Sequence, residues 1–255
     1  MASEQGVIAF FGATGGCANA CLALTLKNGY KATALARTPL KLTNMLKEQG
    51  IDEETISSNL DIVEGSISDV SAVTKTLFPN NRLVSKIVFG IGGTPKLQLS
   101  LLTPITIDNP TVCTDGISSI TKALSDIREQ NGDQGKPVIA VVSSTGTKGA
   151  EDIPIAFKFW YHGLLSVPHN DKTNMERAIL SASDVFNGTV IVRPTLLTGS
   201  QDISSADQSK LKVGTEKNPA IGYTVSRADV GQWIFEQVVN VNSSKWIGEK
   251  VSLTY

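Results

Sequence analysis

The 255-residue sequence has few of the residues from which metal centres and disulfide frameworks are built. It contains three cysteines and two histidines, and no two of the cysteines form a CxxC pair. Cys17 and Cys21 lie four positions apart, but no cluster of histidines accompanies them to complete a metal site. The sequence therefore predicts neither a metal site nor a disulfide framework. A small residue in a loop is the simpler interpretation of Cys17, although a cysteine at a helix start can be reactive.

The sequence also has a net charge close to zero, no long apolar run and no recognisable N-terminal targeting signal. The formal net charge is −1, which favours neither nucleic acid nor an anionic membrane as a partner. No apolar run approaches the roughly 20 residues of a membrane-spanning helix, and residues 1–5 contain no basic segment of a signal peptide. We therefore expect a cytoplasmic protein with a small-molecule substrate and no nucleic-acid or membrane partner. The sequence leaves the oligomeric state open.

What the sequence does contain is a glycine-rich turn between a predicted strand and a predicted helix. Residues 6–11 are apolar, residues 12–18 read GATGGCA, and residues 19–27 are typical of a helix. Glycine allows a sharp turn and a close approach of the backbone to a ligand, and the N–H groups at a helix start attract anions. This order predicts a turn that binds the phosphates of a dinucleotide. The alternative is a glycine turn that binds no ligand.

The spacing of the glycines differs from the G-x-G-x-x-G/A pattern of the common dehydrogenases. Gly12 and Gly15 are separated by two residues, and Ala18 stands in the last glycine position, where it still allows close packing of helix on strand. The longer first gap resembles the short-chain dehydrogenase/reductase superfamily, and the GATG form resembles its atypical, NmrA-like branch. The resemblance implies a doubly wound Rossmann-type α/β domain that binds NAD(P). We expect the cofactor to contact the turn through Gly12, Thr14, Gly15, Gly16 and Cys17.

Arg37 indicates which nicotinamide cofactor binds. In dehydrogenases that bind NAD, an acidic residue about 20 positions after the glycines binds the ribose 2′-OH at the end of the second strand. Residues 31–36 form the predicted second strand, and no Asp or Glu follows it; Arg37 does. A guanidinium pairs well with a 2′-phosphate. The predicted cofactor is therefore NADP(H). The alternative is that Arg37 is a solvated residue at the start of the next helix.

Strands and helices alternate along the rest of the chain. The predicted helices cover residues 40–49, 69–77, 111–130, 173–183 and 229–239, with a polar connection at 51–58; the predicted strands cover residues 60–63, 85–89, 137–142, 187–192 and 250–255. This alternation predicts one α/β domain, residues 1–255, with a mostly parallel sheet of about seven strands. Substrate-side insertions are expected near residues 94–110, 147–168 and 196–222. The first of these is either a self-packed surface loop or one wall of an apolar pocket.

Other cofactor contacts are expected where predicted strands end. Gly90 follows the fourth strand, at the edge of the sheet where ligands of open α/β folds collect. The resemblance puts the adenine beside the loop after the third strand, where Ser66 stands in place of the usual Asp. It also implies that the Arg193-Pro194 turn closes over the nicotinamide through Pro194. Residues 226–230, SRADV, resemble a structural step into a late helix.

The catalytic signature of the superfamily, Tyr-x-x-x-Lys, is incomplete. Lys172 matches the lysine, which holds the nicotinamide ribose and lowers the pKa of the tyrosine, but Pro168 stands in the tyrosine position. Substitute proton donors are His169, then Tyr161, His162 or Ser144. The alternative for His169 is a solvent-facing residue at a helix start, and the aromatic segment at residues 155–165 is either a helix packed on the core or a lid.

The serine after the strand at residues 137–142 completes the predicted site. In short-chain reductases a Ser or Thr at this place hydrogen-bonds the substrate carbonyl; Ser144 is the best match here and Ser143 the second. The resemblance, together with Arg37, thus implies an NADPH-dependent reductase of a small, fairly apolar carbonyl, imine or enone. Two alternatives stay open: an NADP(H)-binding redox sensor without turnover, and a non-redox isomerase or cyclase on the same scaffold.

Overall fold

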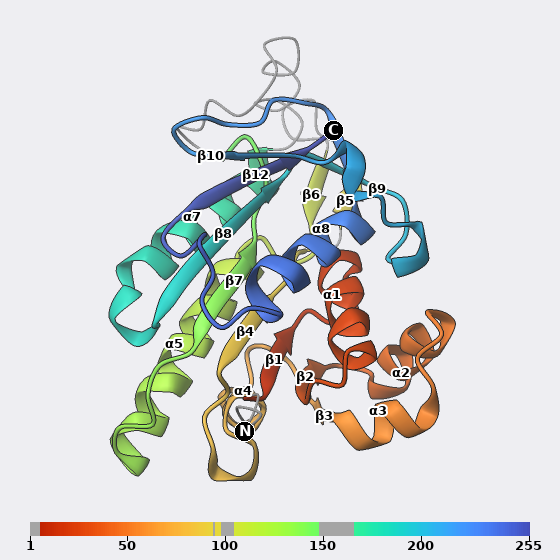
Figure 1. The fold of residues 1–255 in the computed structure, drawn as a ribbon. Helices are drawn as coiled ribbons and strands as arrows, with labels where there is room; N and C mark the ends of the chain where they lie inside the picture. Colours follow the sequence, from red (N-terminus) through yellow and green to blue (C-terminus); the bar gives the residue numbers. More distant parts are fainter. Residues whose placement is uncertain (1–5, 94, 98–104, 148–165) are drawn as a thin grey trace.

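An eight-stranded sheet with helices on both faces forms the centre of the computed structural model, which describes residues 6–93, 95–97, 105–147 and 166–255 (Figure 1). The strand order is β10-β12-β8-β7-β4-β1-β2-β3. All neighbouring strands pair in parallel except β10, which is antiparallel to β12. The predicted doubly wound, mostly parallel α/β fold is therefore confirmed. The sheet exceeds the predicted count because β10 adds an edge strand within a segment expected to be irregular.

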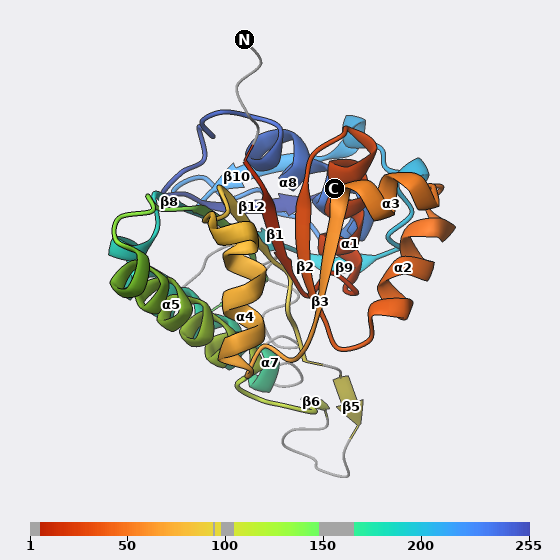
Figure 2. The ribbon, with the colours of Figure 1, turned by 90° about the horizontal axis from the view of Figure 1, so that it is seen from below.

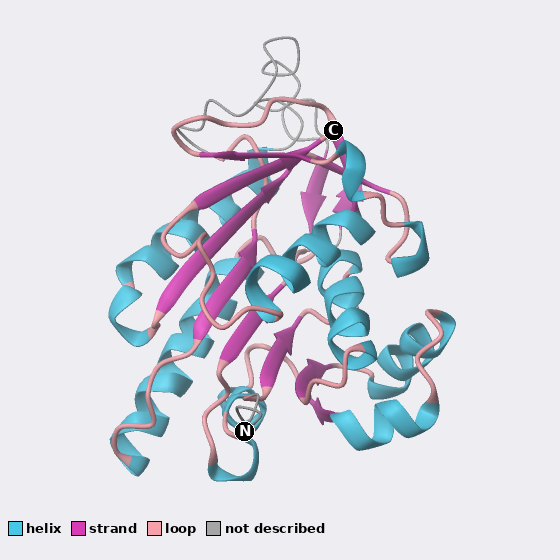
Figure 3. Cartoon of the chain, in the orientation of Figure 1, coloured by secondary structure: helices cyan, strands magenta, loops and turns pink. Residues whose placement is uncertain are grey.

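The strands of the main sheet are short, and all except the two edge strands β3 and β10 are almost entirely buried. They are β1 (Ile8–Phe11), β2 (Ala32–Ala36), β3 (Leu60–Glu64), β4 (Lys86–Phe89), β7 (Val138–Val142), β8 (Gly188–Pro194), β10 (Lys212–Thr215) and β12 (Lys250–Thr254). Central parallel strands are covered on both faces and are therefore apolar almost throughout. Two smaller sheets pair β5 (Pro95–Leu97) with β6 (Ile105–Ile107) and β9 (Leu196–Thr198) with β11 (Thr224–Ser226) (Figure 3).

The helices form two layers. They are α1 (Gly16–Lys27), α2 (Pro39–Glu48), α3 (Glu53–Asn59), α4 (Val70–Leu77), α5 (Val112–Asn131), α7 (Ser166–Ser181) and α8 (Arg227–Ile234), which continues as a π turn at Phe235–Val239. Short 3-10 turns lie at Pro79–Asn81, Ser183–Val185, Ile203–Ser205 and Gln208–Lys210. One apolar core packs α1, α2, α3 and α8 on the sheet, and a second packs α4, α5 and α7 on its other face (Figure 2).

Most predicted helices are confirmed, but one helix was not predicted and the start of another was wrong. Residues 51–58, expected as a connection, contain α3, whose start is capped by Asp52 through the backbone N–H of Thr55. The helix expected over residues 173–183, opened by residues 169–172, spans Ser166–Ser181, so His169 and Lys172 lie inside α7. Pro168 does not prevent this start, because the N–H groups in the first turn of a helix have no intrahelical partner.

The order of the strands positions the site. The chain runs from β1 outward through β2 and β3 and then returns to add β4 on the other side of β1. Ligands of open α/β sheets bind at this kind of switch point, outside the carboxyl ends of the strands. Those ends lie at the upper edge of the sheet in Figure 1. None of the helices in the described ranges is both long and apolar enough to span a bilayer.

Candidate functional site

The glycine turn brings two backbones into contact at the switch point. Gly12 has a φ of +80°, and a Cβ at this residue would lie 2.6 Å from the carbonyl carbon of Gly90, at the end of β4. The turn closes through a hydrogen bond from the N–H of Gly15 to the carbonyl oxygen of Gly12, 2.8 Å. Neither the positive φ nor the close approach is compatible with a side chain. Gly12 is therefore fixed by geometry.

The helix start behind the turn is built to receive an anion. Gly15 is the N-cap of α1, no side chain caps the helix, and no acidic residue lies in its first turn. The first backbone N–H groups of the helix are thus available to a ligand, and the helix dipole favours a negative one. A Cβ at Gly90 would lie 2.6 Å from the Cβ of Ala18. The glycine at the end of β4 therefore makes room for the alanine that replaces the last glycine of the pattern.

A buried amide supports the turn from behind. The side chain of Asn19 is fully buried in α1, and its Nδ2 donates to the carbonyl oxygen of Ala13 at 2.8 Å. Its Oδ1 accepts a hydrogen bond from Nε2 of Gln49, 2.6 Å away, at the end of α2. This pair was not predicted from the sequence, because no spacing rule indicates that an amide side chain inside a helix turns back to the loop before the helix.

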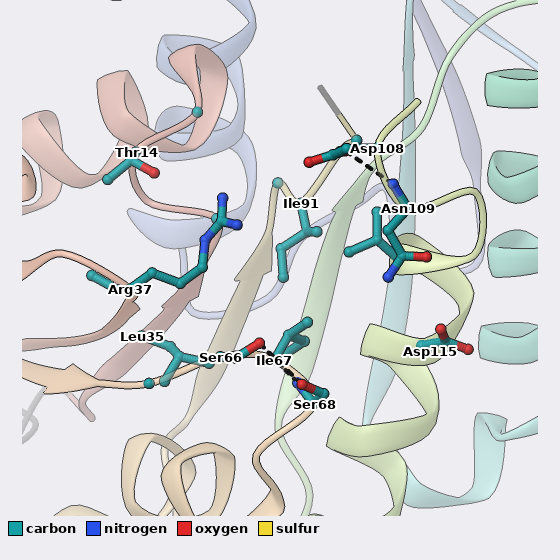
Figure 4. Close-up of a pocket in the computed structure, with 18 of the residues that line it drawn as sticks. Thr14, Leu35, Arg37, Ser66, Ile67, Ser68, Ile91, Asp108, Asn109 and Asp115 are labelled. Atoms are coloured by element: carbon teal, nitrogen blue, oxygen red, sulfur yellow. Dashed lines mark hydrogen bonds between the residues drawn. The ribbon is translucent and has the colours of Figure 1, made fainter. Parts of the chain in front are cut away.

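A cavity of about 400 Å³ opens in front of the turn (Figure 4). It is lined by Gly12, Thr14, Gly15, Leu35, Ala36, Arg37, Lys41, Gly65, Ser66, Ile67, Ser68, Gly90, Ile91, Gly92, Gly93, Asp108, Asn109, Val112 and Asp115. Six of the predicted cofactor residues lie in this lining: Gly12, Thr14, Gly15, Arg37, Ser66 and Gly90. The cavity thus joins the ends of β1, β2, β3 and β4 into one site.

Charge is distributed unevenly around the cavity. Arg37, directly after β2, and Lys41, in the first turn of α2, are both exposed and line one side. Asp108, Asn109 and Asp115 line the side opposite Arg37 (Figure 4). No role was predicted for Lys41 from the sequence. Its position four residues after Arg37 was the available signal, but only the turn from β2 into α2 brings both cations to one cavity.

The loop after β3, where Ser66 was expected beside the adenine, brings two hydroxyl groups to the cavity. The hydroxyls of Ser66 and Ser68 lie 3.1 Å apart in the loop after β3. Ile67 lies between them and also lines the cavity. An aspartate at the usual place is absent, and the hydroxyl of Ser66 is the group that this loop offers in its stead.

Lys172 lies at the carboxyl ends of β4 and β7. Its Nζ donates to the carbonyl oxygens of Ile91, 2.9 Å away, and Val142, 2.7 Å away. Ile91 is itself part of the cavity lining. An ammonium group has three donors, and these two bonds hold it at the edge of the site. The assignment of Lys172 to the nicotinamide ribose stays a prediction, and its position is compatible with it.

The residue before Lys172 fixes the helix that carries it. Asp171 is 2% exposed, and its carboxylate accepts hydrogen bonds from the backbone N–H groups of Cys113 at 2.9 Å and Thr114 at 3.0 Å. The hydroxyl of Thr114 donates to the same carboxylate at 2.7 Å. Asp171 thus caps the start of α5, whose residues Val112 and Asp115 line the cavity.

The two candidate serines have different surroundings. Ser143 is buried, and its hydroxyl donates to Oε1 of Glu176 at 2.6 Å, so it faces α7. Ser144 is half-buried and donates to the backbone oxygen of Thr145 at 3.0 Å. This arrangement favours Ser144 for contact with a substrate. Of the substitute proton donors, His169 lies in α7 with a partly exposed side chain, whereas Tyr161 and His162 fall outside the described residues.

Four predicted cofactor residues lie outside the cavity lining: Lys172, described above, and Gly16, Cys17 and Pro194. Gly16 is the first residue of α1, and Cys17 follows it with its thiol buried. Pro194 ends β8, and its carbonyl oxygen accepts the N–H of Thr145 at 3.0 Å. The neighbouring Arg193 points to α7, where its guanidinium binds both carboxylate oxygens of Glu176. Cofactor contacts by Gly16, Cys17 and Pro194 stay predictions.

The three thiols are expected to be unreactive in the folded protein. All three cysteines are buried. Burial raises the pKa of Cys17 to about 12, with Arg227 and Lys172 acting in the opposite direction, and burial raises the pKa of Cys113 to about 11. Because the thiolate is the reactive form, a thiol reagent at pH 8 should label none of them before denaturation and all three in denaturant. Rapid labelling of the native protein would contradict this.

Known proteins resemble the chain over its whole length. A family model described as NAD(P)H-binding matches residues 12–240. "Reductase pytE" of Aspergillus terreus is 43% identical over 100% of both chains. "Oxidase pynE" of Aspergillus niger is 40% identical over 97% of this chain and 98% of its own.

Solved structures share the fold. A short-chain dehydrogenase/reductase from Veillonella parvula in complex with NADP superposes with a TM-score of 0.66 at 18% identity, over 98% of this chain and 94% of the other. An anaerobillin reductase from Escherichia coli O157:H7 gives a TM-score of 0.63 at 18% identity, over 97% and 96% of the two chains. The glycine turn, the cavity and Lys172 all lie within the residues that the family model matches. The chain therefore belongs to the NAD(P)H-binding family.

Proposed function

We propose that the protein is an NADPH-dependent reductase of a small, fairly apolar carbonyl, imine or enone. The observation that carries the choice of cofactor is the pair of exposed cations, Arg37 and Lys41, on the cavity beside the glycine turn. No acidic residue stands at the end of β2, where an NAD-binding chain holds the ribose 2′-OH. Two cations at that place suit a 2′-phosphate instead.

The coarser class, an NAD(P)-dependent oxidoreductase, has independent support. The family is NAD(P)H-binding, and two relatives are named for redox reactions, one as a reductase and one as an oxidase. The relative that matches over the full length of both chains is named a reductase, and this name favours the reductive direction. The printed names give no substrate, so the substrate class rests on the resemblance set out above.

The residues present fit the cofactor. The N–H groups at the uncapped start of α1, beside Gly12 and Gly15 of the cavity lining, would bind a pyrophosphate, and Arg37 and Lys41 would hold the 2′-phosphate. When bound, NADPH supplies a hydride from C4 of its nicotinamide ring. Lys172, held by the ends of β4 and β7, would fix the nicotinamide ribose. Ser144 would hydrogen-bond the substrate oxygen or nitrogen. Among the histidine and tyrosine candidates for the proton donor, His169 is the one that lies within the described residues.

Arg37→Ala is expected to weaken NADPH binding by about tenfold to a hundredfold, because a charge-assisted hydrogen bond contributes about 1.5–3 kcal/mol. NADH has no 2′-phosphate, so its affinity should change less than threefold. Fluorescence titration with each cofactor measures both values. Lys136→Ala, which removes an exposed cation remote from the cavity lining, is the control. Equal loss for both cofactors would contradict the assignment of Arg37 to the 2′-phosphate.

Turnover tests the proposed activity directly. The protein is titrated with NADPH and NADH and then incubated with NADPH and a panel of ketones, cyclic imines and enones. Oxidation of NADPH by any member of the panel supports a reductase, and Ser144→Ala should then lower kcat. If the protein binds neither NADPH nor NADH, the proposal is overturned.

A redox sensor is the second candidate, and Pro168 in the tyrosine position favours it. A sensor binds NADPH and NADP⁺ with different affinities and oxidises nothing on the panel. Tight NADPH binding without turnover on any class of electrophile would favour this candidate over the reductase.

A further inference from the structure

The side chain of Arg227 crosses the first residue of α1. A Cβ at Gly16 would lie 2.3 Å from Cδ of Arg227 and 3.1 Å from its Cγ. Gly16 thus lacks a side chain where the arginine passes over it. The crossing is set by the contact of α8 with α1, which lie side by side in Figure 1. A Cβ at Gly231 of α8 would be 2.6 Å from the carbonyl oxygen of Cys17, so the two helices are in backbone contact.

The position of this arginine is electrostatically unfavourable without an anion. The start of α1 carries the positive end of the helix dipole, and its first turn contains no acidic residue. Arg227 adds a full positive charge there. Both cations act on the thiol of Cys17: burial raises its pKa, whereas Arg227 and, to a smaller extent, Lys172 lower it. Three sources of positive potential therefore meet at the glycine turn.

The contacts of Arg227 do not neutralise it. Its guanidinium donates to the carbonyl oxygen of Gly199 at 2.8 Å. Within the described ranges no carboxylate forms an ion pair with it, and the nearby Asp229 is occupied by Ser226, Tyr255 and the backbone of Asp207. A guanidinium has five donors in a planar fork, so donors remain for an anionic ligand.

We propose that Arg227 binds the pyrophosphate of the dinucleotide together with the N–H groups of the glycine turn. The proposal rests on the proposed function, because it places the cofactor at the start of α1. It assigns a binding role to the SRADV segment, for which the sequence predicted only a structural one. Through Gly199, the same side chain links the bound phosphates to the loop that follows β9.

The two arginines have different ligands, and the ligands can be separated. Arg37 faces the place of the 2′-phosphate, which NADH lacks; the pyrophosphate is common to NADPH, NADH and ADP-ribose, and adenosine 2′-monophosphate has no pyrophosphate. Arg227→Met is therefore expected to weaken NADPH, NADH and ADP-ribose alike by about tenfold or more, as for the loss of a charge-assisted hydrogen bond. Its affinity for adenosine 2′-monophosphate should change less than twofold.

Equilibrium titration of the intrinsic or nicotinamide fluorescence measures these affinities without turnover, and competition measures the two non-fluorescent ligands. Lys27→Met is the matched control, since it removes one positive charge from the last turn of the same helix; all four affinities should stay within twofold. Arg227→Lys keeps the charge without the fork and should lose less affinity than Arg227→Met. The melting temperature of each variant shows whether it is folded.

Four results would overturn the proposal. Wild-type affinities in a folded Arg227→Met would do so, as would a loss confined to NADPH, which would move Arg227 to the 2′-phosphate. A loss for all four ligands together with a lowered melting temperature in both Arg227 variants would indicate a structural role. Wild-type protein that binds neither dinucleotide would overturn the proposed function as well, so the two failures are distinguishable.

Discussion

Gly12→Ala should abolish cofactor binding and lower the free energy of unfolding by about 2–5 kcal/mol. Part of this cost is conformational, since an L-residue at a φ of +80° costs about 1–2 kcal/mol. The rest is overlap: the new Cβ would meet the carbonyl carbon of Gly90 at 2.6 Å and the nitrogen of Ile91 at 2.7 Å. Both are backbone atoms at the end of β4, so neither can rotate away, and overpacking of this kind costs about 1–3 kcal/mol.

The same overlap also affects binding, because the displaced atoms form the site. Gly12, Gly90 and Ile91 all line the cavity. A shift that relieves the overlap moves the end of β4 away from the start of α1, and the pyrophosphate loses its N–H donors. We expect NADPH affinity to fall more than a hundredfold, measured by titration on protein shown by circular dichroism to be folded.

Gly29→Ala is the matched control. Its φ is +77°, nearly that of Gly12, but no atom lies within 4 Å of the added Cβ. This variant therefore carries only the conformational cost of about 1–2 kcal/mol and should bind NADPH as the wild type does. If both variants lose the same stability and Gly12→Ala still binds NADPH, the close approach of the two backbones is not required.

The fold could be predicted where one local pattern decided the structure. Residues 137–142 are continuously apolar, as a strand covered on both faces must be, and they contain β7. Asp69 precedes an amphipathic segment and caps α4 through the N–H groups of Ser71 and Ala72. The pattern failed at α3, whose face contributes a single buried residue, Ile56, and at β10, a short edge strand whose pairing with β12 is not encoded locally.

The candidate site could be predicted only as far as the ends of strands. Gly12, Arg37 and Gly90 follow predicted strands directly, so the parallel sheet itself brings them together. The sequence could not separate Ser143 from Ser144, because the partner that turns Ser143 away, Glu176, is 33 residues further along the chain. In the same way the cap that Asp171 places on α5 crosses 57 and 58 residues, beyond any local rule.

The ion pair of Glu176 with Arg193 is expected to give the largest loss of stability on truncation. Both side chains are 6% exposed, and the guanidinium donates to Oε1 at 3.0 Å and to Oε2 at 2.6 Å. Ser143 adds a third hydrogen bond to the same carboxylate. Glu176→Ala removes both of these hydrogen bonds from the buried guanidinium of Arg193, and breaking a buried ion pair costs about 3–5 kcal/mol. Urea denaturation of the two proteins measures the difference.

The surface partner of Arg193 provides the control. Glu216 is 52% exposed and lies 3.5 Å from NH1 of Arg193 and 2.7 Å from Nζ of Lys250. Because exposed ion pairs contribute about 0–1 kcal/mol, Glu216→Ala should cost no more than that. Comparable losses for Glu176→Ala and Glu216→Ala would show that water reaches Arg193 and that the pair is not buried in solution.

A double substitution separates the cost of an unpaired charge from the cost of lost packing. If the loss in Glu176→Met comes from stranding Arg193, then removing the charge as well, in Glu176→Met with Arg193→Met, should restore at least half of it, since apolar pairs replace buried ion pairs at little cost. If packing dominates, the double variant should be less stable than either single one. The first result would show that the ion pair is not needed for stability. If kcat also fell in the double variant, the pair would serve to position α7, and with it Lys172, against β8.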